Sequence, residues 1–188
     1  MNIKPEDKRY PLIQLLSVYK PADAADDARR SHVKDFVEST PDCFERTHVA
    51  GHITGSAWVV DKTGEKVLLT HHKKLGKWLQ LGGHADGNPD VLATALREAE
   101  EESSLPNLKP VSNAIFDVDV HSIPARPEEP EHLHYDIRFL VRATGQEKFT
   151  VSDESNTLAW VTLGNVPNLS KEESLLRMLR KWEISRRI

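Results

Sequence analysis

Hydrophobic and polar residues follow the period of a helix over the first quarter of the chain. Leucine and isoleucine residues at positions 12–16 begin one short helix. A second helical pattern starts after Pro21 and ends at Pro41. The pattern predicts an N-terminal helical extension over residues 1–47, packed on a main domain over residues 48–188 that includes a C-terminal helix.

From residue 51 onward the period shortens to that of strands with one buried face. Residues 53–60 and 66–70 flank the turn signal Asp61-Lys62-Thr63-Gly64 and predict a hairpin. Further strands are expected over residues 113–121, 131–142 and 157–163. An amphipathic helix is then expected over residues 169–186. Its apolar stripe is typical of a core contact or a homodimer surface. Its basic residues suggest a solvated face.

The composition is that of a globular protein and narrows the range of partners. The 188 residues include 25 Lys plus Arg and 29 Asp plus Glu, which gives a net charge of −4. This balance argues against a stable nucleic-acid partner or an anionic membrane surface. Cys43 is the single cysteine, so neither an intrachain disulfide nor a Cys-based zinc site is expected. Without an apolar run of ~20 residues or a secretory leader, the sequence predicts a cytoplasmic protein with no membrane span.

Three glutamates share one edge of a predicted helix that follows a Gly-Gly loop. Asn88 and Pro89 are typical of a helix start, with Asn88 as the N-cap and Pro89 as the first helical residue. At about 100° per residue, the glutamates at i, i+3 and i+4 fall within about 100° of one another. These are Glu98, Glu101 and Glu102. A hard cation such as Mg²⁺ relieves their repulsion, whereas the alternative is an ordinary solvated acidic face.

The spacing of this segment resembles the Nudix box over residues 83–105. Gly83, the run Arg97-Glu98-Ala99-Glu100-Glu101-Glu102 and Leu105 fit the motif. Two positions depart from it: Pro89 stands where the family has a glutamate, and Ser104 where it has a glycine at the helix end. Asp90 is the residue best placed to replace the missing acid.

The resemblance implies a Nudix-type α/β/α sandwich around a small mixed sheet. It also implies Mg²⁺-dependent hydrolysis of a diphosphate bond in a nucleoside diphosphate derivative or nucleotide, with Mn²⁺ as a substitute metal. Glu98, Glu101 and Glu102 would hold the metal with the Gly83 carbonyl, and Arg97 would fix one glutamate, most simply Glu101. The general base would be a box glutamate or an acid from a later loop, and Glu154 is our choice.

Two other functions use the same scaffold. An enzyme similar to isopentenyl-diphosphate isomerases would need a catalytic cysteine, yet Cys43 has no recognisable motif around it and is typical of a small core residue. A non-catalytic nucleotide-binding module would not need the intact Arg97-Glu98 and Glu101-Glu102 pairs. The hydrolase is therefore favoured.

The nine histidines are many for a chain of this length. By the period of two, His132, His134 and Asp136 share one strand face, and Asp117, Asp119 and His121 share a face of the preceding strand. If the two strands pair, the faces join beside the loop that contains His84. The joined face is either a solvated sheet surface or a site for substrate phosphate or a further metal. In the second case we expect protonated His84 and His134 to contact the substrate phosphate.

Overall fold

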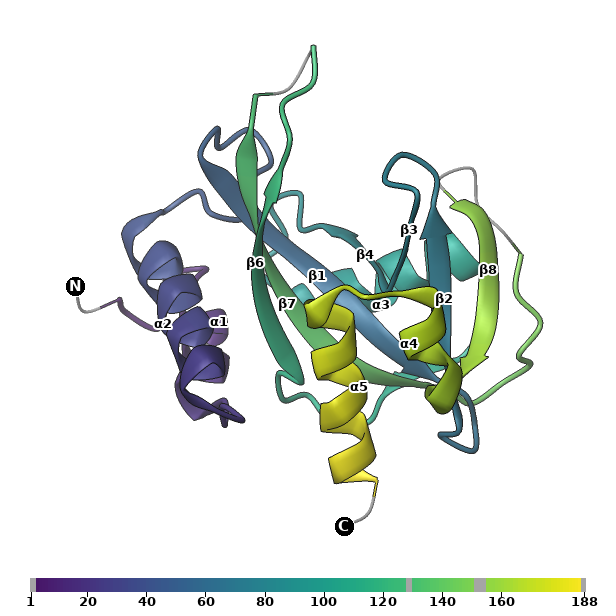
Figure 1. Cartoon of the computed structure of the whole chain (residues 1–188). Helices are drawn as coiled ribbons and strands as arrows, with labels where there is room; N and C mark the ends of the chain where they lie inside the picture. Colours follow the sequence, from purple (N-terminus) through teal and green to yellow (C-terminus); the bar gives the residue numbers. More distant parts are fainter. Residues whose placement is uncertain (1–2, 128–129, 151–154, 187–188) are drawn as a thin grey trace.

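A curled mixed sheet forms the centre of the molecule (Figure 1). The computed structural model describes residues 3–127, 130–150 and 155–186. Strands β1 (Gly51–Val60) and β7 (His132–Ala143) are parallel over ten residue pairs, from Gly51 opposite Leu133 to Val60 opposite Arg142. The other pairings are antiparallel. Five of the eight strands follow the order β3 (Lys77–Leu79), β2 (Lys66–His72), β1, β7 and β5 (Leu108–Pro110). The other three are β4 (Leu81–His84), paired with β1, β6 (Asp117–Ile123), paired with β7, and β8 (Ser155–Thr162), paired with β2.

The other elements have the following bounds. The helices are α1 (Tyr10–Val18), α2 (Ala24–Ser39), α3 (Val91–Ser103), α4 (Val166–Leu169) and α5 (Glu173–Ser185), with a 3₁₀ turn at Leu163–Asn165.

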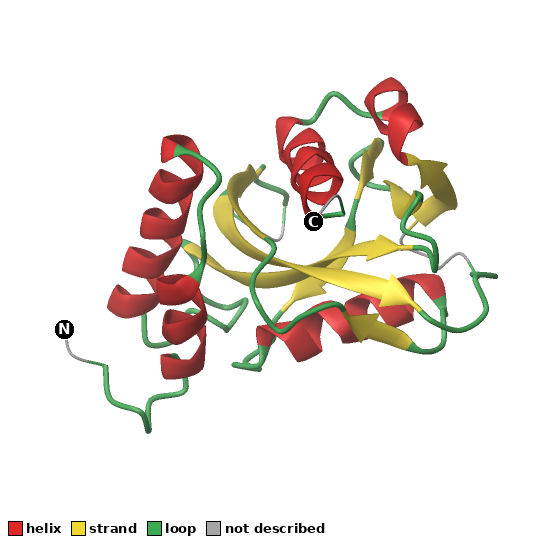
Figure 2. Ribbon diagram, turned by 90° about the horizontal axis from the view of Figure 1, so that it is seen from below, coloured by secondary structure: helices red, strands yellow, loops and turns green. Residues whose placement is uncertain are grey.

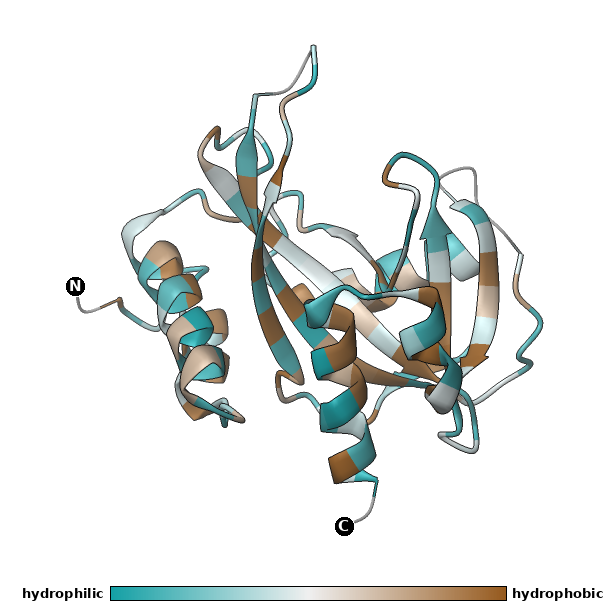
Figure 3. Cartoon of the chain, viewed as in Figure 1, coloured by the Kyte–Doolittle hydropathy of each residue, from teal (hydrophilic) through white to brown (hydrophobic). Residues whose placement is uncertain are grey.

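Two hydrophobic cores use alternate residues of the central strand. Ile53, Ala57 and Val59 of β1 belong to the core that contains α3, whereas Trp58 and Val60 belong to the core under α5. Figure 2 shows α3 and α5 on opposite faces of the sheet. In Figure 3 hydrophobic and hydrophilic residues alternate along α5 and β6, as expected of elements with one buried face. The predicted α/β/α sandwich with a mixed sheet is confirmed.

The two predicted N-terminal helices are present as α1 and α2, of which α2 lies beside β6 and α1 contacts α2 (Figure 1). Buried residues of both helices join the first core, and the Phe36 ring stacks on Tyr135 of β7 with 3.8 Å between ring centroids. The N-terminal segment therefore shares its core with the sheet. The division of the chain at residues 47 and 48 stays a prediction.

Several boundaries differ from the sequence prediction. Helix α3 begins two residues later than expected, because the Asn88 side chain accepts the Asp90 N–H and the Asp90 carboxylate caps the helix by accepting the Ala93 N–H. The predicted C-terminal helix is divided into α4 and α5 by an extended residue, Ser170. Strand β5 is short, and the sequence pattern did not predict it.

A buried network of ion pairs fixes α5 to the sheet. Arg177 donates hydrogen bonds to both carboxylate oxygens of Asp117, at 2.8 and 2.9 Å, and to Asp119 at 2.9 Å. Lys181 contacts Asp117 and also Asp26 of α2, at 2.8 Å from the latter. The interpretation of the basic residues of this helix as a solvated face is therefore wrong for Arg177 and Lys181. The apolar stripe of the helix is buried in the second core, and a homodimer stays a prediction.

None of the helices in the described part of the chain is long and apolar enough to cross a membrane.

Candidate active site

A cleft of about 570 Å³ opens between α3, the loop after β2 and the polar ends of β6 and β7. It brings together most of the side chains that the sequence singled out. Its lining includes Gly83, His84, Arg97, Glu98, Glu101, Glu102 and His134. The box helix and the histidine face, which are separate in the sequence, therefore belong to one site.

Helix α3 is held firmly against the sheet, so that its acidic edge has a fixed position. Ala95 and Ala99 are fully buried, and Asp90 caps the helix at its N-terminal end. Gly55 of β1 allows the close approach, since a Cβ there would lie 2.8 Å from the Val91 carbonyl oxygen. Small residues on both surfaces bring the helix onto the strand and direct its opposite edge into the cleft.

The three glutamates have different surroundings along that edge. Glu98 lies against Gly83, where a Cβ would stand 2.3 Å from its carboxylate oxygen Oε2. Glu102 is nearly buried, and its Oε1 accepts a hydrogen bond of 2.8 Å from the Gly82 N–H. The Glu101 side chain is 60% exposed. The Gly-Gly segment of β4 therefore makes room for the carboxylates.

Arg97 connects two of these carboxylates to the loop. Its Nη1 lies 2.7 Å from Glu98 Oε1 and 3.1 Å from Glu101 Oε2. Its Nη2 donates a hydrogen bond of 3.1 Å to the His84 carbonyl oxygen. The predicted pair with Glu101 is present, and the pair with Glu98 is an addition to it.

These donors suit a hard divalent cation. Three carboxylates and the backbone of Gly83 face one cleft, and oxygen ligands of this kind are those that Mg²⁺ prefers. Because Gly83 has no side chain, the Glu98 carboxylate can lie directly beside the Gly83 backbone. Glu98, Glu101 and Glu102 could therefore hold the ion together with Gly83.

Positively charged side chains gather at the rim of the same cleft. The loop after β2 contributes Lys73 and Lys74, and Arg46 and Arg126 extend the lining. Arg46 also forms an ion pair with Asp86 in the loop before α3. Such a rim attracts an anionic ligand toward the carboxylates, whose own charge a cation would offset.

The histidine face is a wall of the cleft. Strands β6 and β7 pair as predicted, with His121 opposite His134 and Asp119 opposite Asp136. His132 and Asp136 are buried and His134 is half-buried, so the interpretation as a solvated sheet surface is wrong. Burial and the neighbouring histidines lower the pKa of His134 to about 2. This shift disfavours the protonated form of His134, and contact of His134 with the substrate phosphate stays a prediction.

A match to the sequence profile of the NUDIX domain covers residues 52–182. The chain belongs to the NUDIX family. The family assignment gives the class of enzyme: the protein is a hydrolase that acts on phosphoric anhydrides.

Solved structures of Nudix proteins have the same fold. An Ap4A hydrolase from C. elegans aligns with a TM-score of 0.59 at 17% identity, covering 72% of this chain and 97% of that one. A NUDIX-family hydrolase from Clostridium perfringens aligns with a TM-score of 0.54 at 26% identity, covering 71% and 97%. The dihydroneopterin triphosphate pyrophosphohydrolase of E. coli aligns with a TM-score of 0.55 at 13% identity, covering 71% and 95%. No curated protein matches the chain significantly.

Two other candidates come from parts of the sequence outside the Nudix box. Glu154 falls outside the described residues, but Ser155, which follows it, contacts Thr70 of the cleft lining. Cys43 is fully buried in the first core, and burial raises the pKa of its thiol to about 12. A thiol in this position cannot serve as the acid or base of an isomerase acting in the cleft.

Sequence reasoning missed several residues of this Nudix site. His52 of β1 lies opposite His134 in the parallel register and is only 1% exposed. Thr54, Ser56, Gln80 and Arg138 were also missed, and all four donate hydrogen bonds to Asp136, which the sequence did indicate. The signal was present in the alternation of polar His52, Thr54 and Ser56 with apolar neighbours along β1, which predicts one polar face.

Proposed function

We propose that this Nudix protein is a Mg²⁺-dependent hydrolase that cleaves a diphosphate bond in a nucleoside diphosphate derivative or a nucleotide. The observation that supports it best is the shared cleft, in which Glu98, Glu101 and Glu102 lie below a rim of lysine and arginine side chains. Carboxylates suit a cation and the rim suits a phosphate chain, so the cleft fits a metal-bound diphosphate.

The box residues have complementary roles in this proposal. The three glutamates hold Mg²⁺, or Mn²⁺ in its place, with the Gly83 carbonyl as a further ligand. A divalent ion at such a site neutralises phosphate oxygens and lowers the pKa of bound water. Arg97 keeps the carboxylates of Glu98 and Glu101 in position, since it contacts both and is itself fixed by the His84 carbonyl.

The general base and the substrate contacts complete the proposal. We assign the base to Glu154, because the residue after it contacts the cleft lining. His84 and His134 line the cleft, and we assign them to the substrate side, where imidazole nitrogens can form hydrogen bonds with the phosphate chain. The solved neighbours include enzymes named for Ap4A and for dihydroneopterin triphosphate, and both compounds contain phosphate chains. The basic rim supports a substrate with such a chain.

The test uses a panel of nucleoside diphosphate derivatives and nucleoside triphosphates, assayed with Mg²⁺ for release of phosphate or nucleoside monophosphate. For any substrate found, Glu101→Gln and Glu102→Gln should each lower kcat by about 100-fold or more, because each loses a charged metal ligand. Glu100→Gln is the matched control, since Glu100 is an exposed neighbour that does not line the cleft. Near-wild-type activity of the Glu101 and Glu102 variants at saturating Mg²⁺ would contradict the assignment.

A further inference from the structure

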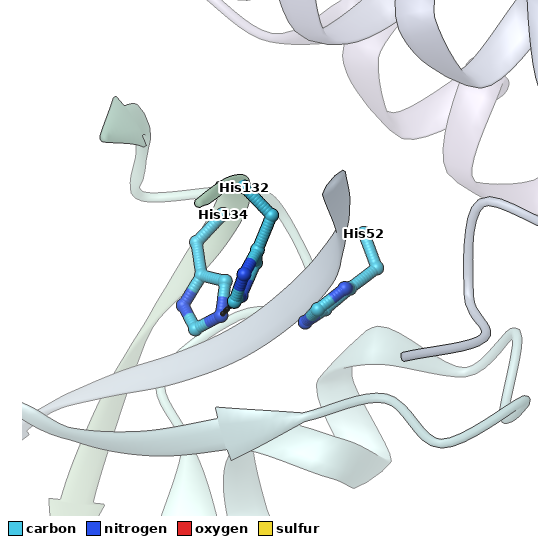
Figure 4. A group of neighbouring side chains, drawn as sticks. All are labelled: His52, His132 and His134. Carbon is cyan, nitrogen blue, oxygen red and sulfur yellow. Dashed lines mark hydrogen bonds between the residues drawn. The ribbon is translucent and has the colours of Figure 1, made fainter. Parts of the chain in front are cut away.

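We propose that His52, His132 and His134 form a second metal site, made of imidazole nitrogens and suited to Zn²⁺ rather than Mg²⁺. Figure 4 shows the three side chains, from β1 and β7, turned toward a common point. One ring nitrogen of each residue lies within 4.8 Å of the corresponding nitrogen of the other two. Ligand atoms of a tetrahedral zinc site are about 3.3 Å apart when each lies about 2.0 Å from the ion, so binding requires the most distant nitrogens to move closer by up to about 1.5 Å.

The state of His52 is the observation that most directly indicates a ligand. The side chain is 1% exposed, and within the described part of the chain neither its Nδ1 nor its Nε2 has a hydrogen-bond partner. A buried polar group without a partner is destabilising, and such groups are rare in folded proteins. A metal ion bound to one of these nitrogens would supply the missing interaction.

The His132 imidazole is oriented as a zinc ligand usually is. His132 Nδ1 lies 2.9 Å from the Pro130 carbonyl oxygen, which can only accept a proton, so Nδ1 is the protonated nitrogen. A carbonyl partner on the far nitrogen is the common way in which proteins fix a ligating histidine. In the neutral tautomer the lone pair of His132 lies on Nε2, which forms a hydrogen bond of 3.2 Å with His134 Nε2, and a bound cation would take the place of this hydrogen bond. Two imidazole nitrogens this close suit a shared cation.

The donor set decides the class of metal. Imidazole nitrogen is a ligand for zinc and the later transition metals, whereas Mg²⁺ takes oxygen. Three neutral imidazoles leave one tetrahedral position open and the charge of the ion uncompensated. The His84 ring is the nearest further donor, with its centroid 4.9 Å from that of His52 and 5.0 Å from that of His134.

The location gives the second ion a role in the proposed hydrolysis. His132 and His134 line the same cleft as the glutamates of α3, so an ion between them would bind a phosphate oxygen of the substrate. This role rests on the proposed function, whereas the metal site itself does not. His134 would then contact the substrate through the ion.

The experiment measures Zn²⁺ binding without substrate, on the full chain prepared without a polyhistidine tag. Isothermal titration of wild type with Zn²⁺ should show one tight site, and Co²⁺ should give the visible absorption of a tetrahedral complex. His134→Ala and His52→Gln should weaken Zn²⁺ binding by at least about 100-fold, because each removes one of three ligands. The control His71→Ala, outside the cleft, should bind as wild type does.

Further variants separate this site from the glutamate site. Glu101→Gln should keep the Zn²⁺ affinity of wild type even where it abolishes hydrolysis, so failure of either proposal is recognised independently. Loss of Zn²⁺ binding in Glu101→Gln with retention in the histidine variants would overturn the site, as would a wild type that lacks the tetrahedral Co²⁺ spectrum. Circular dichroism checks folding, and His132→Ala serves as a second ligand variant if His52→Gln does not fold.

Discussion

Removal of the Arg177 side chain tests whether the buried ion pairs between α5 and the sheet hold this Nudix fold together. Arg177 is buried and donates four hydrogen bonds, two to Asp117 and one each to Asp119 and the Val118 carbonyl. In Arg177→Leu these acceptors lose a charged partner while they stay buried. Removal of one partner of a buried ion pair typically costs 3–5 kcal/mol.

The expected loss lies at the lower end of this range, at about 3 kcal/mol. Asp117 keeps its contacts with Arg138 and Lys181, so it is not left without a cation. For a chain of this size, each kcal/mol lowers Tm by about 2–4 °C, which gives a decrease of about 6–12 °C. Differential scanning calorimetry and urea titration at pH 7 measure the two quantities.

The matched control is Arg180→Leu on the same helix. The Arg180 side chain is 53% exposed and pairs only with exposed Glu173 among the described residues, so its loss should cost less than about 0.5 kcal/mol. Equal losses of Tm in the two variants would refute the reasoning, since the burial of Arg177 would then have no energetic consequence.

Three further predictions concern the Nudix box and the dependence of stability on pH. Ser104 has the left-handed backbone at the end of α3, with φ of 54°, so Ser104→Gly should stabilise the fold by about 0.5–1 kcal/mol in urea titration; destabilisation would refute the backbone argument. Asp90→Ala should cost about 1 kcal/mol by loss of the N-cap, in the same assay, and an unchanged midpoint would show that the cap is dispensable. Burial alone would raise the pKa of Asp26, but the contacts with Lys181, the Ala22 N–H and Tyr19 lower it below the ordinary 3.8. Its stabilisation is therefore complete above about pH 4 and lost as the pH falls further, so urea midpoints measured between pH 6 and 2 should decrease less in Asp26→Asn than in wild type; equal slopes would contradict this.

The sequence predicted those features that depend on local period and spacing. The hairpin, the paired strands around His134, and the acidic edge of α3 follow from patterns within about ten residues. The beginning of α3 was misplaced because Asn88 and Asp90 are both good caps, and only their hydrogen bonds show which one acts on the helix.

Features that depend on contacts between distant segments could not be predicted in this way. Arg177 is an ordinary basic residue of an amphipathic helix until Asp117, 60 positions earlier, is placed beneath it. His52 likewise becomes a candidate ligand only because the parallel pairing places it opposite His134, and no local pattern predicts that pairing. The identity of the general base stays a prediction, because Glu154 lies outside the described residues.

The ten-residue parallel register of β1 and β7 has a consequence for folding. A long connection joins the two strands, so their pairing costs more loop-closure entropy than the local hairpin does. We therefore expect the pairing to form after the hairpin. A slip of one residue would exchange the two faces of β1, turning Ile53 toward the cleft and His52 into the apolar core. The imidazoles of His52 and His134 can meet only in the correct register, so Zn²⁺ binding during refolding would report when the central pairing of the sheet is complete.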